Sequence, residues 1–216
     1  EDLLVLTAAK RLGRPVKWIE DRQEHMMAAN QGRNQHHRAK IAVDENGMIL
    51  GMADEFWHDQ GGYIRTHGAN VPSRTMCMLT GAYKVPAYKA LCHLRLTNKT
   101  PAATYRAPGR FESTFVRERL MDAVAEKLGM DRIELRRRNL ITAADMPFAI
   151  DFDEPHVENM LIDSGDYPTL LEKALTHFKW DQLQAELAER RAAGEMVGSG
   201  MGIFVEESGK GPQDGA

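Results

Sequence analysis

RFESTFVRERLMDAVAEKL, residues 110–128, holds the clearest helical pattern in the chain. Gly129 follows as a C-terminal cap, and Asp131 is predicted to begin a second, short helix that reaches about Arg138. The face expected to be buried carries the apolar residues at helical spacing: Phe111, Phe115, Leu120, Met121, Val124, Ala125 and Leu128.

The chain before this helix predicts a mixture of elements. Leucine and alanine residues at helical spacing indicate a helix from residue 3 to residue 12 that is closed by Gly13, and Pro15 then begins an extended run over residues 16–19. Residues 35–45 and 48–58 read as two strands, and Asn46-Gly47 between them is a strong hairpin signal. A further strand is expected over residues 89–96.

After this helix, the predicted elements follow a long irregular stretch. Residues 141–166 are rich in proline, aspartate and asparagine and read as a loop or linker. Two helices, over about 167–178 and 181–193, and a strand near residues 202–207 are predicted to follow. Together these elements predict an α/β (α+β) fold of mixed sheets with packed helices, in which the chain passes into another domain near residue 160.

Composition excludes several classes of protein. A net charge of −3 and a pI of about 6.3 over 216 residues give no electrostatic reason to expect binding to nucleic acid. Cys77 and Cys92 form no metal or iron–sulfur ligand set, and a reducing, cytoplasmic setting is expected. No apolar run approaches the ~20 residues of a membrane span. Because the chain starts at Glu1 inside a helical pattern, we expect an internal fragment of a longer protein.

Nine groups of motifs, in order along nearly the whole chain, resemble one known family. Each motif alone is weak, but their order and spacing together are specific. They are GRPVKW (13–18) with EDRQE (20–24), DQGGY (59–63), GAYKVP (81–86), TNK (97–99), TYRAPGR (104–110), ERLMD (118–122), LRRRNL (135–140), DSGDY (163–167), and GIFVE (202–206) with GKGP (209–212). The family is that of the molybdenum hydroxylase large subunits, which includes xanthine dehydrogenase, aldehyde oxidase and aerobic carbon monoxide dehydrogenase.

The resemblance implies an oxidoreductase that hydroxylates an aldehyde or an N-heterocycle with oxygen from water. It implies molybdenum bound to a molybdopterin, in the cytosine dinucleotide form, with a 2Fe-2S small subunit and an FAD medium subunit as partners in a homodimer of heterotrimers. Residues 1–160 would be the latter part of a first molybdopterin-binding domain, and residues 161–216 linker helices and the start of a second. The glutamate base of the family lies outside this chain, so the fragment alone is expected to be inactive.

The TYRAPGR loop supplies the expected cofactor-binding residues, Arg106, Ala107 and Pro108. A guanidinium presents a planar fork of donors to phosphate and to anionic metal ligands, and the resemblance places Arg106 beside the molybdenum. Ala107 stands where the carbon monoxide-oxidising members have a copper-binding cysteine, and alanine cannot bind copper. Pro108 stands where the xanthine enzymes have a phenylalanine that stacks on substrate. Ala107 therefore favours an organic substrate over carbon monoxide. Pro108 indicates that this substrate is not held by the stacking seen in the xanthine enzymes.

Two further residues are expected to act on substrate. Arg74 lies nine residues before Tyr83, where the xanthine enzymes have an arginine that polarises substrate, and it could stabilise negative charge in the transition state. Glu206 lies at the end of the last predicted strand, where a carboxylate could orient substrate. The alternative for Arg74 is an arginine on a helix surface without a role in the site. The alternative for Glu206 is a solvated acid at a strand end.

Other residue groups are assigned structural roles. Asp59, with the glycines after it, reads as a close-packed strand end. Residues 136–138 read as ion pairs at a helix end rather than as a nucleic-acid patch, and His36-His37 as a solvated strand start rather than a metal site. No resident metal ligand set is expected within the chain. A non-catalytic relative used for binding or assembly remains an alternative function, and an unrelated protein with chance motif matches remains a further one.

Overall fold

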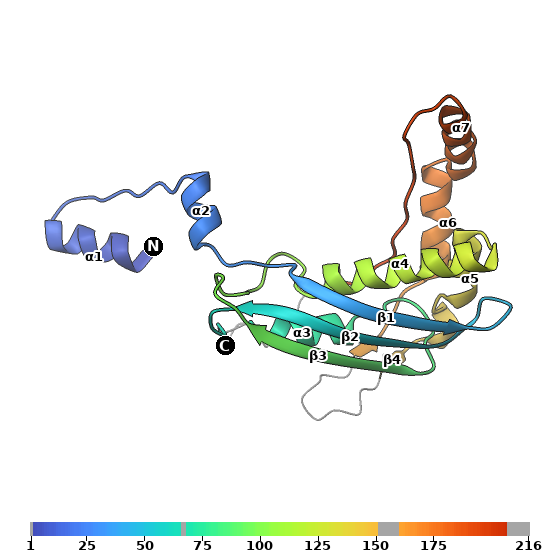
Figure 1. Ribbon diagram of the computed structural model, residues 1–216, viewed down its shortest axis with the longest axis horizontal. Helices are drawn as coiled ribbons and strands as arrows, with labels where there is room; N and C mark the ends of the chain where they lie inside the picture. Colours follow the sequence, from blue (N-terminus) through green and yellow to red (C-terminus); the bar gives the residue numbers. More distant parts are fainter. Residues whose placement is uncertain (1, 66–67, 151–159, 207–216) are drawn as a thin grey trace.

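The computed structural model describes residues 2–65, 68–150 and 160–206, and its centre is a three-stranded mixed sheet (Figure 1). The strands β1 (Gln35–Val43), β2 (Ile49–Gly61) and β3 (Tyr88–Leu96) lie in this order across the sheet. The pair β1 and β2 is antiparallel, and the pair β2 and β3 is parallel. The three strands predicted at residues 35–45, 48–58 and 89–96 and the predicted mixed sheet are therefore confirmed.

The hairpin between β1 and β2 turns at the predicted Asn46-Gly47. Gly47 has a φ of 78°, a conformation that favours glycine, and the carboxylate of Asp44 accepts hydrogen bonds from the backbone N–H groups of Asn46 and Met48. The parallel pairing of β3 requires the chain to cross over, and the crossover contains α3 (Asn70–Cys77), a helix that the sequence pattern did not predict.

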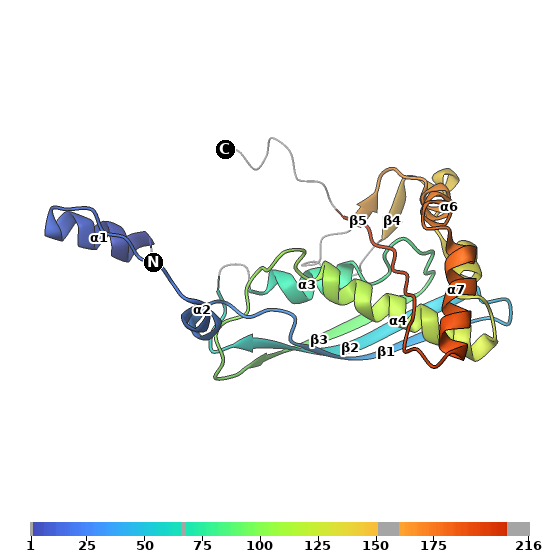
Figure 2. The same cartoon turned by 90° about the horizontal axis from the view of Figure 1, so that it is seen from above.

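The helices α4 (Arg110–Leu128) and α5 (Arg132–Asn139) have the predicted bounds and caps. Gly129 ends α4 with a φ of 62°, and the Asp131 side chain accepts hydrogen bonds from the first turn of α5. Figure 2 shows α3 and α4 on one face of the sheet. Together these helices and the inner face of the sheet enclose the main core, which includes Met52, Leu79 and Tyr83.

The predicted buried face of α4 is partly wrong. Phe111 and Phe115 are 58% and 62% exposed. The residues that α4 buries are Glu112, Ser113, Arg117, Glu118, Met121, Val124 and Ala125. Its N-terminal half thus turns charged groups inward, which is tolerated only if those groups are paired.

A buried ion network explains this inversion. Glu118 accepts hydrogen bonds from Nε of Arg117 and Nε of Arg136, both at 3.0 Å, and from the hydroxyl of Tyr83 at 3.1 Å. Arg136 also bonds Asp122 at 3.0 Å. Burial raises the pKa of Tyr83, and the adjacent Glu118 carboxylate adds to that rise, so the hydroxyl stays a donor. Two arginines and two acids thereby neutralise one another between α4 and α5.

The triple arginine of α5 makes ion pairs, as predicted. Arg137 pairs with Glu172 and Arg138 with Glu134, and both arginines are exposed. Arg136 differs because its side chain is fully buried, which the sequence did not indicate.

The C-terminal part departs from prediction in two places. Residues 141–166, expected to be a loop, contain the 3-10 turn η1 (Ala143–Asp145) and a two-stranded sheet of β4 (Phe148–Ile150) and β5 (Met160–Ile162). The helices α6 (Tyr167–His177) and α7 (Trp180–Ala192) follow as predicted. Residues 202–206 are not part of a sheet, so the predicted strand is wrong over these residues, and Glu207 lies outside the described residues.

At the other end, α1 (Asp2–Leu12) and α2 (Arg22–Ala28) lie apart from the sheet and bury no residue (Figures 1 and 2). Gly13 ends α1 as predicted, with a φ of 60°, whereas residues 16–19 form no strand and α2 was not predicted. In the described ranges no helix combines the length and the apolar character that crossing a membrane would require.

Candidate functional site

The segment 105–109, which we call the arginine loop, lies immediately before α4 and rests against α3. Gly109 has a φ of 74°, and a Cβ added to it would lie 2.6 Å from Val71 O and from Thr75 N of α3. No side chain fits there, so the glycine permits close contact between loop and helix. Ala107 also has a positive φ, 56°, which costs an L-residue about 1–2 kcal/mol.

Arg33 holds the arginine loop from the far side, and the sequence did not reveal it. Its guanidinium donates to the backbone carbonyls of Arg106 and Ala107, the latter at 3.1 Å, and to the buried carboxylate of Glu112 at 3.1 Å. It also lies over the rings of Tyr105 and Phe111, at 5.2 and 4.7 Å from their centroids. The loop backbone is therefore fixed although its conformation is strained.

The three predicted cofactor-binding residues differ in exposure. Arg106 is exposed, and Ala107 and Pro108 are half-buried. In the part of the chain that the structure describes, the side chain of Arg106 has no acidic partner. A fixed backbone thus presents an unpaired guanidinium, which is the arrangement that an anionic ligand requires.

The two predicted substrate residues both lie next to this loop. Arg74 belongs to α3, and its Cβ would be 2.6 Å from a Cβ at Gly109. Glu206 forms an ion pair with Arg110, the first residue of α4, at 2.9 Å between Oε1 and Nε. The structure therefore brings Arg74, Glu206 and residues 106–108 to one place, the N-terminal end of α4.

A polar cluster beneath α3 fixes the helix that carries Arg74. Gln35 donates to the hydroxyl of Thr75 at 3.0 Å and contacts Nδ1 of His58 at 3.1 Å, and burial lowers the pKa of His58. His37 points inward and contacts Asp54 at 2.7 Å. The prediction of a solvated His36-His37 pair is thus wrong for His37, because alternate strand residues face opposite sides and this one faces the core.

Asp59 anchors the strand end next to the arginine loop. Its carboxylate accepts hydrogen bonds from Thr97 at 2.6 Å, from Asn34 at 2.9 Å and from the N–H of Gly61, and it pairs with Lys99 at 2.7 Å. Burial alone would raise the pKa of Asp59, but the hydrogen bonds from Lys99 and Thr97 and from the Gly61 backbone lower it well below its usual value. These hydrogen bonds and the ion pair with Lys99 give Asp59 a structural role at the strand end.

We expect Asp59→Asn to lower the free energy of unfolding by roughly 2 kcal/mol at pH 7, because charge-assisted hydrogen bonds are lost. A depressed folded-state pKa adds stability above the unfolded pKa of about 3.9, and this contribution is lost as the pH falls below it. The difference between variant and parent should therefore shrink below about pH 4. Urea unfolding at several pH values measures this. Asp163→Asn, at an exposed site, is the control, and a difference that stays constant down to pH 2 would contradict the prediction.

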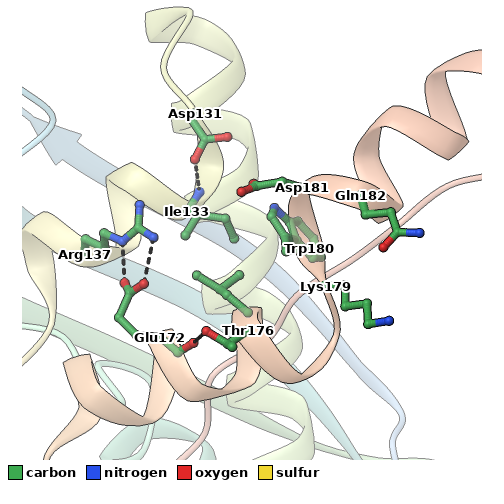
Figure 3. Close-up of a pocket in the computed structure, with 10 residues that line it drawn as sticks. Asp131, Ile133, Arg137, Glu172, Thr176, Lys179, Trp180, Asp181 and Gln182 are labelled. Carbon is green, nitrogen blue, oxygen red and sulfur yellow. Dashed lines mark hydrogen bonds and ion pairs between the residues drawn. The ribbon is translucent and has the colours of Figure 1, made fainter.

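A cavity of about 370 Å³ between α5, α6 and α7 is the main alternative site (Figure 3). It lies at the C-terminal end of α4, away from the arginine loop (Figure 1). Arg137 and Glu172 on its wall bond each other at 2.6 and 3.1 Å, and the ring of Trp180 lies under Arg132. Because these charges neutralise one another, we assign the candidate site to the arginine loop.

No group of three or more histidine, cysteine, aspartate or glutamate side chains is placed to hold a metal ion among residues 2–65, 68–150 and 160–206.

Comparison with known proteins identifies the family of the chain. Residues 1–140 match the family model described as the molybdopterin cofactor-binding domain. The gamma subunit of the 6-hydroxypseudooxynicotine dehydrogenase complex of Paenarthrobacter nicotinovorans is 42% identical over 98% of this chain and 26% of its own length. The carbon monoxide dehydrogenase large chain of Hydrogenophaga pseudoflava is 33% identical over 96% of this chain and 26% of its own.

Solved structures agree with these relatives. Quinoline 2-oxidoreductase from Pseudomonas putida 86 superposes with a TM-score of 0.82 and 31% identity, over 94% of this chain and 25% of that one. The chain thus spans about a quarter of the length of the relatives it matches. From its motifs, its fold and these matches, the chain belongs to the molybdopterin cofactor-binding domain family of molybdenum hydroxylase large subunits.

Proposed function

We propose that this chain forms one wall of the molybdenum–molybdopterin site in the large subunit of an oxidoreductase that hydroxylates an aldehyde or an N-heterocycle. The observation that carries the proposal is the exposed guanidinium of Arg106, which has no acidic partner among the described residues and sits on a loop whose backbone Arg33 and Gly109 fix. The named activities of the relatives, on 6-hydroxypseudooxynicotine and on quinoline, support N-heterocyclic compounds and their derivatives as the substrate class.

The residues of the loop suit an anionic cofactor. Arg106 would donate hydrogen bonds to its negatively charged oxygen or sulfur atoms, and the N-terminal end of α4 adds the positive end of a helix dipole. Ala107 and Pro108 have small side chains, so a large group can approach the backbone. When bound, the molybdenum–pterin group would accept the substrate electrons and supply the water-derived oxygen. Ala107 has no sulfur atom to hold copper, so we exclude carbon monoxide from the proposed substrates.

The other residues would act on the substrate. Arg74 on α3 would stabilise negative charge that develops on a heterocycle during attack. Glu206 would orient the substrate from the other side of the α4 N-terminus, held by Arg110 at 2.9 Å. In the whole protein, residues 1–160 would complete the first molybdopterin-binding domain and residues 161–216 would lead into the second. The expected partners are a 2Fe-2S small subunit and an FAD medium subunit, as a dimer of heterotrimers in the cytoplasm, with the cytosine dinucleotide form of the pterin.

The test is to purify the complete enzyme that contains this chain and to measure its molybdenum, pterin and nucleotide content. We expect about one molybdenum per large subunit and release of a cytosine nucleotide on hydrolysis. Quinoline, 6-hydroxypseudooxynicotine, benzaldehyde and carbon monoxide are then assayed with a tetrazolium dye in ¹⁸O-labelled water. Label in the product of an organic substrate supports the proposal. A complex without molybdenum, or one that oxidises carbon monoxide alone, would overturn it.

A further inference from the structure

The segment 197–206, which we call the tethered segment, runs in an extended conformation without a neighbouring strand. The side chains of residues 201, 203 and 205 are half-buried and pack against the main core, while residues 202, 204 and 206 are exposed. This alternation is that of a strand, which explains the strand prediction. In a sheet, the carbonyl groups along one edge would bond a neighbouring strand.

Arginine side chains take the place of that missing strand. The carbonyls of residues 197, 199, 201 and 203, which alternate along the segment, accept hydrogen bonds in turn from Arg191 at 3.0 Å, Arg132 at 2.7 Å, Arg136 at 3.4 Å and Arg117 at 2.6 Å. Glu206 continues the series through its ion pair with Arg110. The tethered segment is thereby held along α5 and α4 as far as the arginine loop.

Arg117 has the central place in this series. Its side chain is 1% exposed, and all five N–H groups are used. Nε bonds Glu118, Nη1 bonds the carbonyls of Met78 and Leu79 directly after α3, and Nη2 bonds Thr114 and the carbonyl of Ile203. Gly81 makes room for this guanidinium, because a Cβ there would lie 2.4 Å from its Cζ. One side chain therefore joins the end of α3, the body of α4 and the tethered segment.

We propose that Arg117 is a positioning residue of the site, which holds the tethered segment against α3 and α4 and so keeps Glu206 beside the arginine loop. The inference rests on the proposed function, in which Glu206 and Arg74 face the substrate. Arg117 touches neither substrate nor cofactor. It sets the distance between the segment that bears Glu206 and the helix that bears Arg74.

The test uses the complete enzyme with Arg117→Lys, which keeps the positive charge but has fewer donors. Arg119→Met is the matched control, since Arg119 lies on the same helix, is 63% exposed and, among the residues that the structure describes, pairs only with Asp122. Chymotrypsin cleavage of the native enzyme within residues 199–206 should become about tenfold faster in Arg117→Lys, because the released segment can enter the protease, and should not change in the control. Unchanged cleavage in Arg117→Lys would overturn the proposal.

A double-mutant cycle with Glu206→Gln separates positioning from general stabilisation. Turnover of 6-hydroxypseudooxynicotine, or of quinoline if the enzyme prefers it, is measured per molybdenum. We expect Arg117→Lys to lower turnover about fivefold or more with Glu206 present, and to have little effect once Glu206 is replaced. An equal loss in both backgrounds overturns the positioning role. If Glu206→Gln alone leaves turnover unchanged, the proposed role of Glu206 fails, while the proteolysis result still decides whether Arg117 holds the segment.

Discussion

Arg106→Ala should lower turnover of the complete enzyme about 100- to 1,000-fold while leaving subunit assembly intact, because it removes the unpaired cation of the arginine loop. Assembly should survive since the side chain is exposed, and since Arg33 holds the loop through the carbonyl of residue 106 rather than through its side chain. Arg106→Lys keeps the charge without the planar fork of donors. Its turnover should lie between that of the parent enzyme and that of Arg106→Ala.

The measurement is turnover per large subunit, together with molybdenum content and gel filtration. Arg95→Ala is the matched control, because Arg95 is exposed at the end of β3 and, within the described part of the chain, its guanidinium bonds only the carbonyl of the preceding residue. If Arg106→Ala kept full turnover and full molybdenum, the arginine would have no role in the site. A non-catalytic binding or assembly module would then be the better description of the chain.

Glu118→Gln should have the largest effect on stability. The carboxylate is 7% exposed and accepts hydrogen bonds from Arg117, Arg136 and Tyr83. The variant would place an amide NH₂ group against these donors and leave two buried arginines with one fewer negative charge. Breaking a buried ion pair in this way costs about 3–5 kcal/mol.

Urea unfolding of the chain, followed by circular dichroism, gives the free energy of unfolding for this comparison. Glu126→Gln on the exposed side of α4 is the matched control and should change it by less than about 0.5 kcal/mol. A loss below about 1 kcal/mol for Glu118→Gln would mean that the network is not important for stability.

The elements that the sequence predicted correctly are those with a local signal. The hairpin follows from Asn46-Gly47, and α4 and α5 follow from helical spacing with Gly129 and Asp131 as caps. The inward face of α4 could not be predicted in the same way, because spacing rules place charged residues outside. Glu118 is buried because Arg136, 18 residues further along, meets it in three dimensions. Arg117 is buried because it reaches distant backbone carbonyls, those of Met78, Leu79 and Ile203.

The site shows the same division between local and distant signals. Its centre could be located because residues 104–110 form a recognisable motif. Arg33 was missed because it acts on backbone carbonyls 73 and 74 residues away, and a carbonyl carries no signature of residue type. The pairing of Arg110 with Glu206 joins positions 96 residues apart, and it depends on the path of the tethered segment, which no local pattern specifies.

Position 107 also bears on how such a loop could change its chemistry during evolution. Ala107 already occupies the left-handed region, with a φ of 56°. The fold therefore already tolerates the backbone strain of an L-residue at this position. Exchange for another small L-residue such as cysteine or serine would add one heavy atom and no new backbone strain. Starting from glycine, the same step would incur the full strain at once. A loop with alanine at position 107 can therefore gain a new metal ligand or a new contact to substrate by one substitution that adds no backbone strain.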